Sequence, residues 1–126
     1  MNRLWIGIVI LLVISGLSVG LWGGSVAFYG GISRRMEEAG EYALAGNWVV
    51  ATEKAEICRQ KWERYHNFWA SFTDHAPIEE IALLFSQLEV YRRQDLPVEF
   101  AVCCRAISQE AQAIRESHGI AWWSLL

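Results

Sequence analysis

The chain has 126 residues, of which 53% are hydrophobic, and a formal net charge of −3. This length leaves room for one membrane segment and one small domain, and it excludes a second hydrophobic core. Because acidic residues outnumber basic ones by 14 to 11, the composition also argues against the basic surface that a nucleic-acid partner requires.

The N-terminal segment is apolar, and residues 4–29 include no charged side chain. At 1.5 Å per residue, a helix of this length exceeds the roughly 30 Å hydrocarbon core of a bilayer. A cleaved signal peptide is the competing interpretation, with Arg3 in its charged start and Ser25-Val26-Ala27 as its cleavage site. Because the apolar region of a signal peptide is typically about 7 to 15 residues long, we predict a retained transmembrane anchor.

Glycines occur at two kinds of position in this segment. Gly16, Gly20 and Gly24 recur every four residues, the spacing of small residues at which transmembrane helices associate, and they predict a homo-oligomer contact in the bilayer. Gly30 and Gly31 predict a flexible joint. We therefore expect an anchor over residues 1–31 and a helical domain over residues 32–126.

Positive charges flank the anchor on both sides, with Arg3 before it and Arg34 and Arg35 after it. These charges nearly balance, so the short N-terminal tail decides the expectation. We predict a single-pass protein of the cell membrane with its N-terminus in the cytoplasm and its domain outside the cytoplasm.

The first domain helix is predicted to begin at Ser33, a favourable capping residue, and to end where Gly46 and Asn47 permit a left-handed conformation. Residues 43–51, followed by Ala55, resemble the turn of a tetratricopeptide repeat, in which a Gly-Asn-aromatic step joins two antiparallel helices. No second copy follows at the repeat period of about 34 residues. The resemblance therefore implies one helical hairpin and not a peptide-binding superhelix.

A long amphipathic helix is predicted over residues 47–75, because apolar residues recur at steps of three and four. This stripe carries three tryptophans and must be covered by other helices. Its members are Trp48, Ala51, Ala55, Cys58, Trp62, Tyr65, Trp69 and Phe72.

Two more helices follow. The first covers residues 77–93, and a break at residues 94–97 that contains Pro97 separates it from the second. The second runs from about residue 98 to a stop at Gly119. Asp74 is placed to cap the third helix. Short connections favour antiparallel neighbours, so we predict an all-α fold, a transmembrane helix followed by an antiparallel four-helix bundle. The core positions of the last two helices are Ile78, Ile81, Leu84, Phe85, Leu88, Tyr91, Phe100, Cys103 or Cys104, Ile107, Ala111, Ile114 and His118.

Aromatic residues gather where the second and fourth helices of such a bundle end, which is the end that faces the bilayer. They are Trp69, Phe72, Trp122 and Trp123, the last two in a closing tail too apolar to remain in water. The rings either meet lipid headgroups, where tryptophan is favoured, or pack on one another as a cap.

The three cysteines, Cys58, Cys103 and Cys104, lack zinc-type spacing. They are interpreted as small buried hydrophobic residues, or as a bridge from Cys58 to one of the adjacent pair in an oxidising compartment.

Residues able to carry chemistry are sparse. Glu63 and His66 have the spacing of one half of a di-iron motif, but only one such pair exists and it lies on the polar side of its helix. No catalytic, cofactor or metal site is predicted, and the protein is not expected to be an enzyme.

The chain also resembles a family of small single-pass membrane proteins of spore-forming Gram-positive bacteria that is known as a domain of unknown function. The resemblance is carried by the anchor, the step at residues 46–48, Trp62, residues 72–75 leading into Ile78 and Ile81, and the closing residues 122–126. It implies a membrane-anchored helical domain. We expect a protein-interaction or scaffold role at the cell envelope. The alternative is a ligand- or metal-sensing module near Asp74, His75 and His118.

Overall fold

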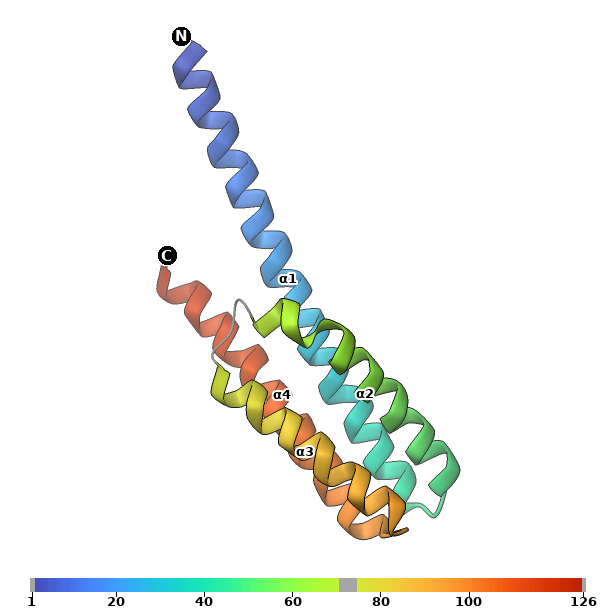
Figure 1. Ribbon diagram of the computed structural model, residues 1–126. Helices are drawn as coiled ribbons and strands as arrows, with labels where there is room; N and C mark the ends of the chain where they lie inside the picture. The colour runs from blue at the N-terminus through green and yellow to red at the C-terminus, as the bar shows by residue number, and fades with distance from the viewer. Residues whose placement is uncertain (1, 71–74, 126) are drawn as a thin grey trace.

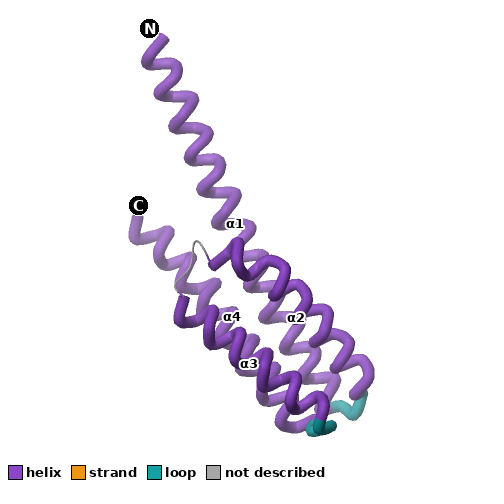
Figure 2. Tube along the Cα trace, in the orientation of Figure 1, coloured by secondary structure: helices purple, strands orange, loops and turns teal. Residues whose placement is uncertain are grey.

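The computed structural model describes residues 2–70 and 75–125, and it shows four helices and no strand within those ranges (Figures 1 and 2). The helices are α1 (Asn2–Leu44), α2 (Trp48–Ala70), α3 (His75–Arg93) and α4 (Pro97–Leu125). The side chains described are those of residues 2–69 and 76–117. The predicted all-α class is confirmed.

The apolar N-terminal segment and the first domain helix are one continuous helix, α1, which Figure 1 shows extending far beyond the other three. The predicted joint at Gly30 and Gly31 is therefore wrong, and Ser33 is not a helix start but a buried residue in the middle of α1. A glycine inside a helix costs about 1 kcal/mol relative to alanine. Burial of Tyr29 and Ile32 on either side of the pair outweighs that cost.

The two halves of α1 have opposite surroundings. Residues 2–20 are all exposed, and the most apolar 18-residue stretch of the helix has a mean hydropathy of 2.5 with none of it buried. The first buried side chain is that of Ser25, after which one face of the helix lies in the core. The exposed half is long and apolar enough to cross a membrane, and a signal sequence would have the same character.

Two tight turns lie together at the end of the molecule away from the N-terminus (Figure 2). In the first, Gly46 has a φ of +87°, which favours glycine, and the Asn47 N–H donates to the Tyr42 carbonyl. In the second, Asp95 has a φ of 53°, a conformation that a short polar residue tolerates. The Trp48 indole N–H donates to Asp95 Oδ1 at 3.3 Å and links the two turns.

The helices alternate in direction, and α1 is central to their packing (Figure 1). It packs along α4 most extensively and along α2 less so, while α3 packs on α4. In contrast, α2 and α3 make few contacts with each other. The core contains Tyr29, Ile32, Met36, Ala39, Ala43, Ala51, Ala55, Cys58, Trp62, Ile78, Ile81, Phe85, Leu88, Phe100, Ala101, Cys103, Cys104, Ile107, Ala111 and Ile114.

Most residues of the predicted amphipathic stripes lie in this core, whereas Trp48, Trp69, Leu84 and Tyr91 are partly buried and pack against it. Tyr65 was expected to be covered but is 45% exposed, although its ring meets that of Phe28 edge to face with the centroids 6.3 Å apart. The predicted helix over residues 47–75 ends within the described chain at Ala70. Phe72 and the proposed cap Asp74 lie outside the described residues.

The predicted stop at Gly119 is wrong, because α4 continues to Leu125. A glycine ends a helix when it adopts the left-handed conformation and the following residues leave the helical path. Residues 120–125 include no proline and are compatible with a helix, so Gly119 is accommodated at the usual glycine cost. The side chains of His118, Trp122 and Trp123 are outside the described set.

Candidate functional site

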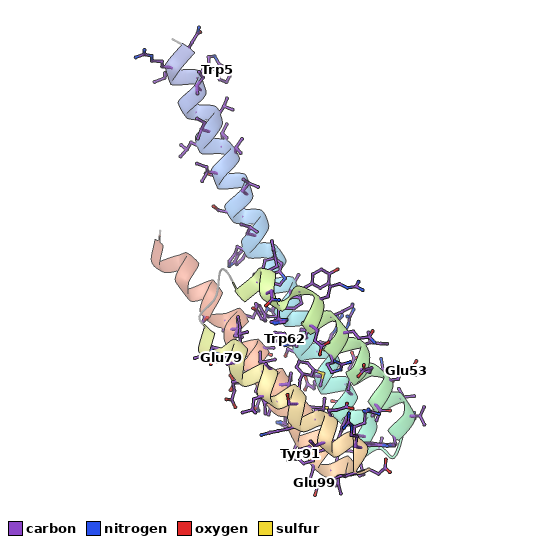
Figure 3. The ribbon with its side chains drawn as sticks, in the orientation of Figure 1. Trp5, Glu53, Trp62, Glu79, Tyr91 and Glu99 are labelled. Carbon is purple, nitrogen blue, oxygen red and sulfur yellow. The ribbon has the colours of Figure 1, made fainter. Side chains whose placement is uncertain are left out.

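A cleft of about 1130 Å³ lies between α2 and α3. It exists because these two helices make few contacts with each other while each packs on another helix. Trp62 and Phe85 form its apolar floor, and their rings lie 6.0 Å apart. Figure 3 shows Trp62 extending from α2. The remaining lining residues are Val49, Thr52, Glu53, Glu56, Arg59, Glu63, His66, Ala82, Ser86, Glu89, Val90, Arg92 and Arg93.

The α2 wall of the cleft is a charge cluster centred on Arg59. Its guanidinium donates to Glu56, with 3.0 Å between Nε and Oε2, and also to Glu63 one turn further on. The hydrogen bond from Arg59 lowers the pKa of Glu56 and, conversely, the bond to Glu56 raises the pKa of Arg59. Glu56 and Arg59 are therefore both ionised at neutral pH.

The α3 wall is the mirror arrangement, with one carboxylate held by two arginines. Glu89 accepts hydrogen bonds from Arg92 Nε at 2.9 Å and from Arg93 Nε at 3.2 Å. The bond from Arg92 is the main cause that lowers the pKa of Glu89 to about 2. The field of Arg92 also acts on Glu56, so the two walls interact electrostatically across the cleft.

Charged walls above an apolar floor favour one class of ligand. A segment of another protein with apolar residues and both signs of charge would satisfy both features, as in recognition of an amphipathic helix by a groove. Of the carboxylates that line the cleft, those of Glu56, Glu63 and Glu89 are paired with arginines.

Replacing Glu89 with glutamine tests the α3 cluster. Because its folded pKa of about 2 lies below the ordinary value of 4.5, Glu89 stabilises the fold fully above about pH 4.5 and loses this effect as the pH falls toward 2. The Glu89 side chain is 29% exposed, so solvent screening limits the effect. We expect Glu89→Gln to lower the free energy of unfolding by about 0.5–1 kcal/mol at pH 7 and by nothing near pH 2.

The measurement is urea unfolding of both chains in nonionic detergent at each pH. Glu110→Gln is the control, because Glu110 lies on α4 and forms no ion pair within the described part of the chain. Equal losses for the two variants at pH 7 would contradict the assignment.

Among the described residues, no group of three or more potential metal ligands comes together. His66 instead stacks on Trp62 at 5.4 Å, and its Nδ1 lies 2.9 Å from the Trp62 carbonyl oxygen. Its neighbour Glu63 pairs with Arg59. Asp74 and the side chains of His75 and His118, the positions of the alternative sensing site, are not described.

The three cysteines are buried free thiols, so neither bridge from Cys58 is formed. Burial raises the pKa of Cys58 to about 12 and that of Cys103 to about 11, and it also raises the pKa of Cys104. The Cys103 thiol donates to the Leu84 carbonyl at 3.1 Å. These thiols are small core groups and not nucleophiles.

Alkylation tests whether the three thiols are buried and unreactive. We expect iodoacetamide at pH 8 to modify none of the three thiols in the folded chain and all three in urea, because only the exposed thiolate reacts. Intact mass gives the number of adducts. A chain with the exposed substitution Gln109→Cys should gain one adduct when folded, and modification of a native thiol at the same rate would contradict burial.

An aromatic cluster lies where α1 enters the packed part of the molecule. The Phe28 ring stacks on that of Trp62, with the centroids 6.2 Å apart, and on that of Trp69, with the centroids 6.1 Å apart. The Phe68 ring meets the Trp69 ring edge to face, with the centroids 4.8 Å apart. A Cβ at Gly24 would lie 2.8 Å from the Trp69 ring. Gly24 therefore accommodates α2, whereas Gly16 and Gly20 have no neighbour within 4 Å among the described residues.

The sequence placed Trp62 and Phe85 on buried helix faces and Glu63 and His66 on the polar side of their helix, but it did not show the cleft. The signal was present as charges three and four residues apart, Glu56, Arg59 and Glu63 on one helix and Glu89, Arg92 and Arg93 on the next. Such spacing predicts pairs along one helix. It does not show that two such faces lie opposite each other.

Comparison with known protein families gives a match over most of the chain. Residues 27–122 match a family described as a domain of unknown function (DUF4363). This range begins near the first buried residues of α1 and includes the whole described core. No curated protein and no solved structure matches the chain.

Proposed function

We propose a function for this protein on the premise that it belongs to the DUF4363 family, a domain of unknown function. In this proposal it is a single-pass membrane-anchored scaffold that binds another protein at the cell envelope. Its domain is an antiparallel helical bundle that opens with a tetratricopeptide-like hairpin, α1 with α2. The α2–α3 cleft is the binding site for the partner.

The observation that carries the proposal is the division of α1. Residues 2–20 of this apolar helix are exposed and no described residue covers them, and a bilayer supplies that cover. The same helix continues without a break into the core, to Ala43. An anchor built this way holds the domain at the membrane surface in a defined orientation, which suits a scaffold.

The hairpin and the cleft support the interaction role. The turn at Gly46 brings α2 back along α1, and the small residues Ala43, Ala51 and Ala55 are buried there, as expected for close helix packing in a tetratricopeptide-like pair. The α2–α3 side is left open over an apolar floor.

The membrane orientation is tested with reporter cysteines in a cysteine-free chain. One replaces Asn2 and the other replaces Asp95, in the turn farthest from the anchor. We expect an impermeant thiol reagent to label position 95 in intact cells and position 2 only after lysis, because the domain lies outside the cytoplasm. Labelling of position 2 alone would place the domain in the cytoplasm.

Partner binding is tested by a photoreactive amino acid at Val90, which lines the cleft, with Leu83 as the matched control. Both residues lie on α3 and are about half exposed, at 50% and 53%, but Leu83 does not line the cleft. We expect a cross-linked product from position 90 in native membranes and none from position 83. Products from both positions, or from neither, would contradict binding in the cleft.

Self-association in the bilayer belongs to the same proposal. With Gly24 packed against Trp69, the open small-residue positions are Gly16 and Gly20. We expect Gly20→Ile to weaken a membrane-embedded dimer assay, and an unchanged signal would exclude this face.

A further inference from the structure

A hollow of about 370 Å³ on the outer side of the α1–α2 hairpin gathers positive charge. Arg34 and Arg35 come from α1, and Lys54 and Lys61 come from α2. Figure 1 shows these two helices side by side. One carboxylate, Glu38, also lines the hollow, so four cations face one anion.

Most of this positive charge is not neutralised within the described part of the chain. Glu38 pairs with Lys54 at 3.7 Å, whereas Arg34, Arg35 and Lys61 form no ion pair with any described residue. Arg35 and Lys61 both act on the buried thiol of Cys58, where their charge opposes the effect of burial on its pKa. The two cations therefore lie over the same part of the core, although they come from different helices.

In the anchored chain, the position of the hollow along α1 brings it close to the lipid headgroups. We place the edge of the hydrocarbon at Gly24, where α1 begins to pack on α2. Arg34 lies ten residues further along α1, which is about 15 Å along a helix. Side chains on a helix lean toward its N-terminus, and on α1 that is the direction of the apolar half. The headgroup layer occupies about 5–7 Å beyond the hydrocarbon. The guanidinium of Arg34 therefore lies within about one Debye length of the headgroups.

Apolar side chains of α2 lie in and next to the hollow. Ile57 lines the hollow and is about half exposed, and the exposed rings of Tyr65 and Phe68 follow on α2 toward the apolar half of α1. Cations next to exposed aromatic and aliphatic groups match the boundary between phosphate and acyl chains.

We propose that this hollow binds the phosphate-bearing headgroup of an anionic phospholipid, with Arg34, Arg35 and Lys61 as its ligands. The inference rests on the anchored protein of the proposed function. It adds a specific lipid contact on the α1–α2 side of the domain.

The test uses the full chain in nonionic micelles that contain equal amounts of phosphatidylglycerol and phosphatidylcholine. Native mass spectrometry then counts the lipids that each chain retains. We expect retention of phosphatidylglycerol over phosphatidylcholine by several-fold. Arg34→Gln or Lys61→Gln should each lower this ratio at least twofold, and the double variant should bring it near one.

Arg105→Gln is the matched control, because Arg105 is an exposed cation on α4 outside the hollow, and its removal should leave the ratio unchanged. Equal retention of the two lipids by the native chain would overturn the proposal, as would an equal fall with Arg105→Gln. Displacement of the lipid by free glycerol phosphate would show a site for soluble anions instead. The same spectra give the intact mass, so loss of the N-terminal segment would contradict the anchor separately.

Discussion

Replacing Trp62 with alanine is expected to lower the free energy of unfolding by about 3–5 kcal/mol, the usual range for a buried aromatic residue. Trp62 is 2% exposed, and its ring contacts those of Phe28, His66 and Phe85. Its removal leaves a cavity where α2 meets α1 and removes the floor of the cleft. Urea unfolding in nonionic detergent, followed by circular dichroism, gives the difference.

Phe68→Ala is the control for this substitution. Phe68 is an aromatic residue on the same helix but is 52% exposed, so we expect its loss to cost about 1 kcal/mol or less. Comparable losses for the two variants would show that the core does not depend on Trp62.

Replacing Gly40 with leucine is expected to cost about 3 kcal/mol, at the upper end of the range for overpacking. A Cβ at this position would lie 3.3 Å from both the Ala101 carbonyl oxygen and the Cys104 Cβ. One of these atoms belongs to the backbone of α4, so the two helices must separate to admit a larger side chain. That separation also disturbs the hydrogen bond, 2.9 Å long, between the buried hydroxyls of Ser33 and Ser108.

Gly31→Leu is the matched substitution on the same helix. A Cβ at Gly31 has no neighbour within 4 Å among the described residues, so the leucine is accommodated. Because leucine is a better helix former than glycine, we expect no loss and a gain of up to about 1 kcal/mol. Thermal unfolding of both variants in one detergent is the measurement. A loss at Gly31 equal to that at Gly40 would contradict close packing of α1 on α4.

The tests of function depend on these stability results. Variants on the cleft walls and in the basic hollow change exposed or half-exposed groups, so the fold should tolerate them. Core variants change the fold and its surfaces together. A cross-linking or lipid-retention result is therefore interpreted only for chains whose unfolding matches that of the native protein.

Local pattern was sufficient to predict much of this fold. Apolar spacing of three and four identified the buried faces of α2, α3 and α4, because a helix repeats every 3.6 residues whatever it packs against. Gly46, Asp95 and Pro97 marked the turns, since each has a backbone preference that acts within a few residues. The long uncharged run identified the apolar half of α1 in the same way.

Where local preference competed with packing, the sequence misled. Gly30, Gly31 and Gly119 are helix breakers by propensity, yet α1 and α4 continue through them, because each costs only about 1 kcal/mol against contacts made along the whole helix. Tyr65 has the spacing of a core residue, yet its side chain is about half exposed.

By itself, then, the sequence determined the helical class, the buried faces, the two turns and an apolar segment long enough for a membrane. Only the tertiary structure decided that α1 is continuous, that Gly24 and Gly40 admit neighbouring helices, and that α2 and α3 separate to form a cleft. The physical reason is that periodicity reports which face of each helix is buried. The distances between helices depend on how side chains far apart in the sequence fit together, and both the cleft and the basic hollow are set by those distances.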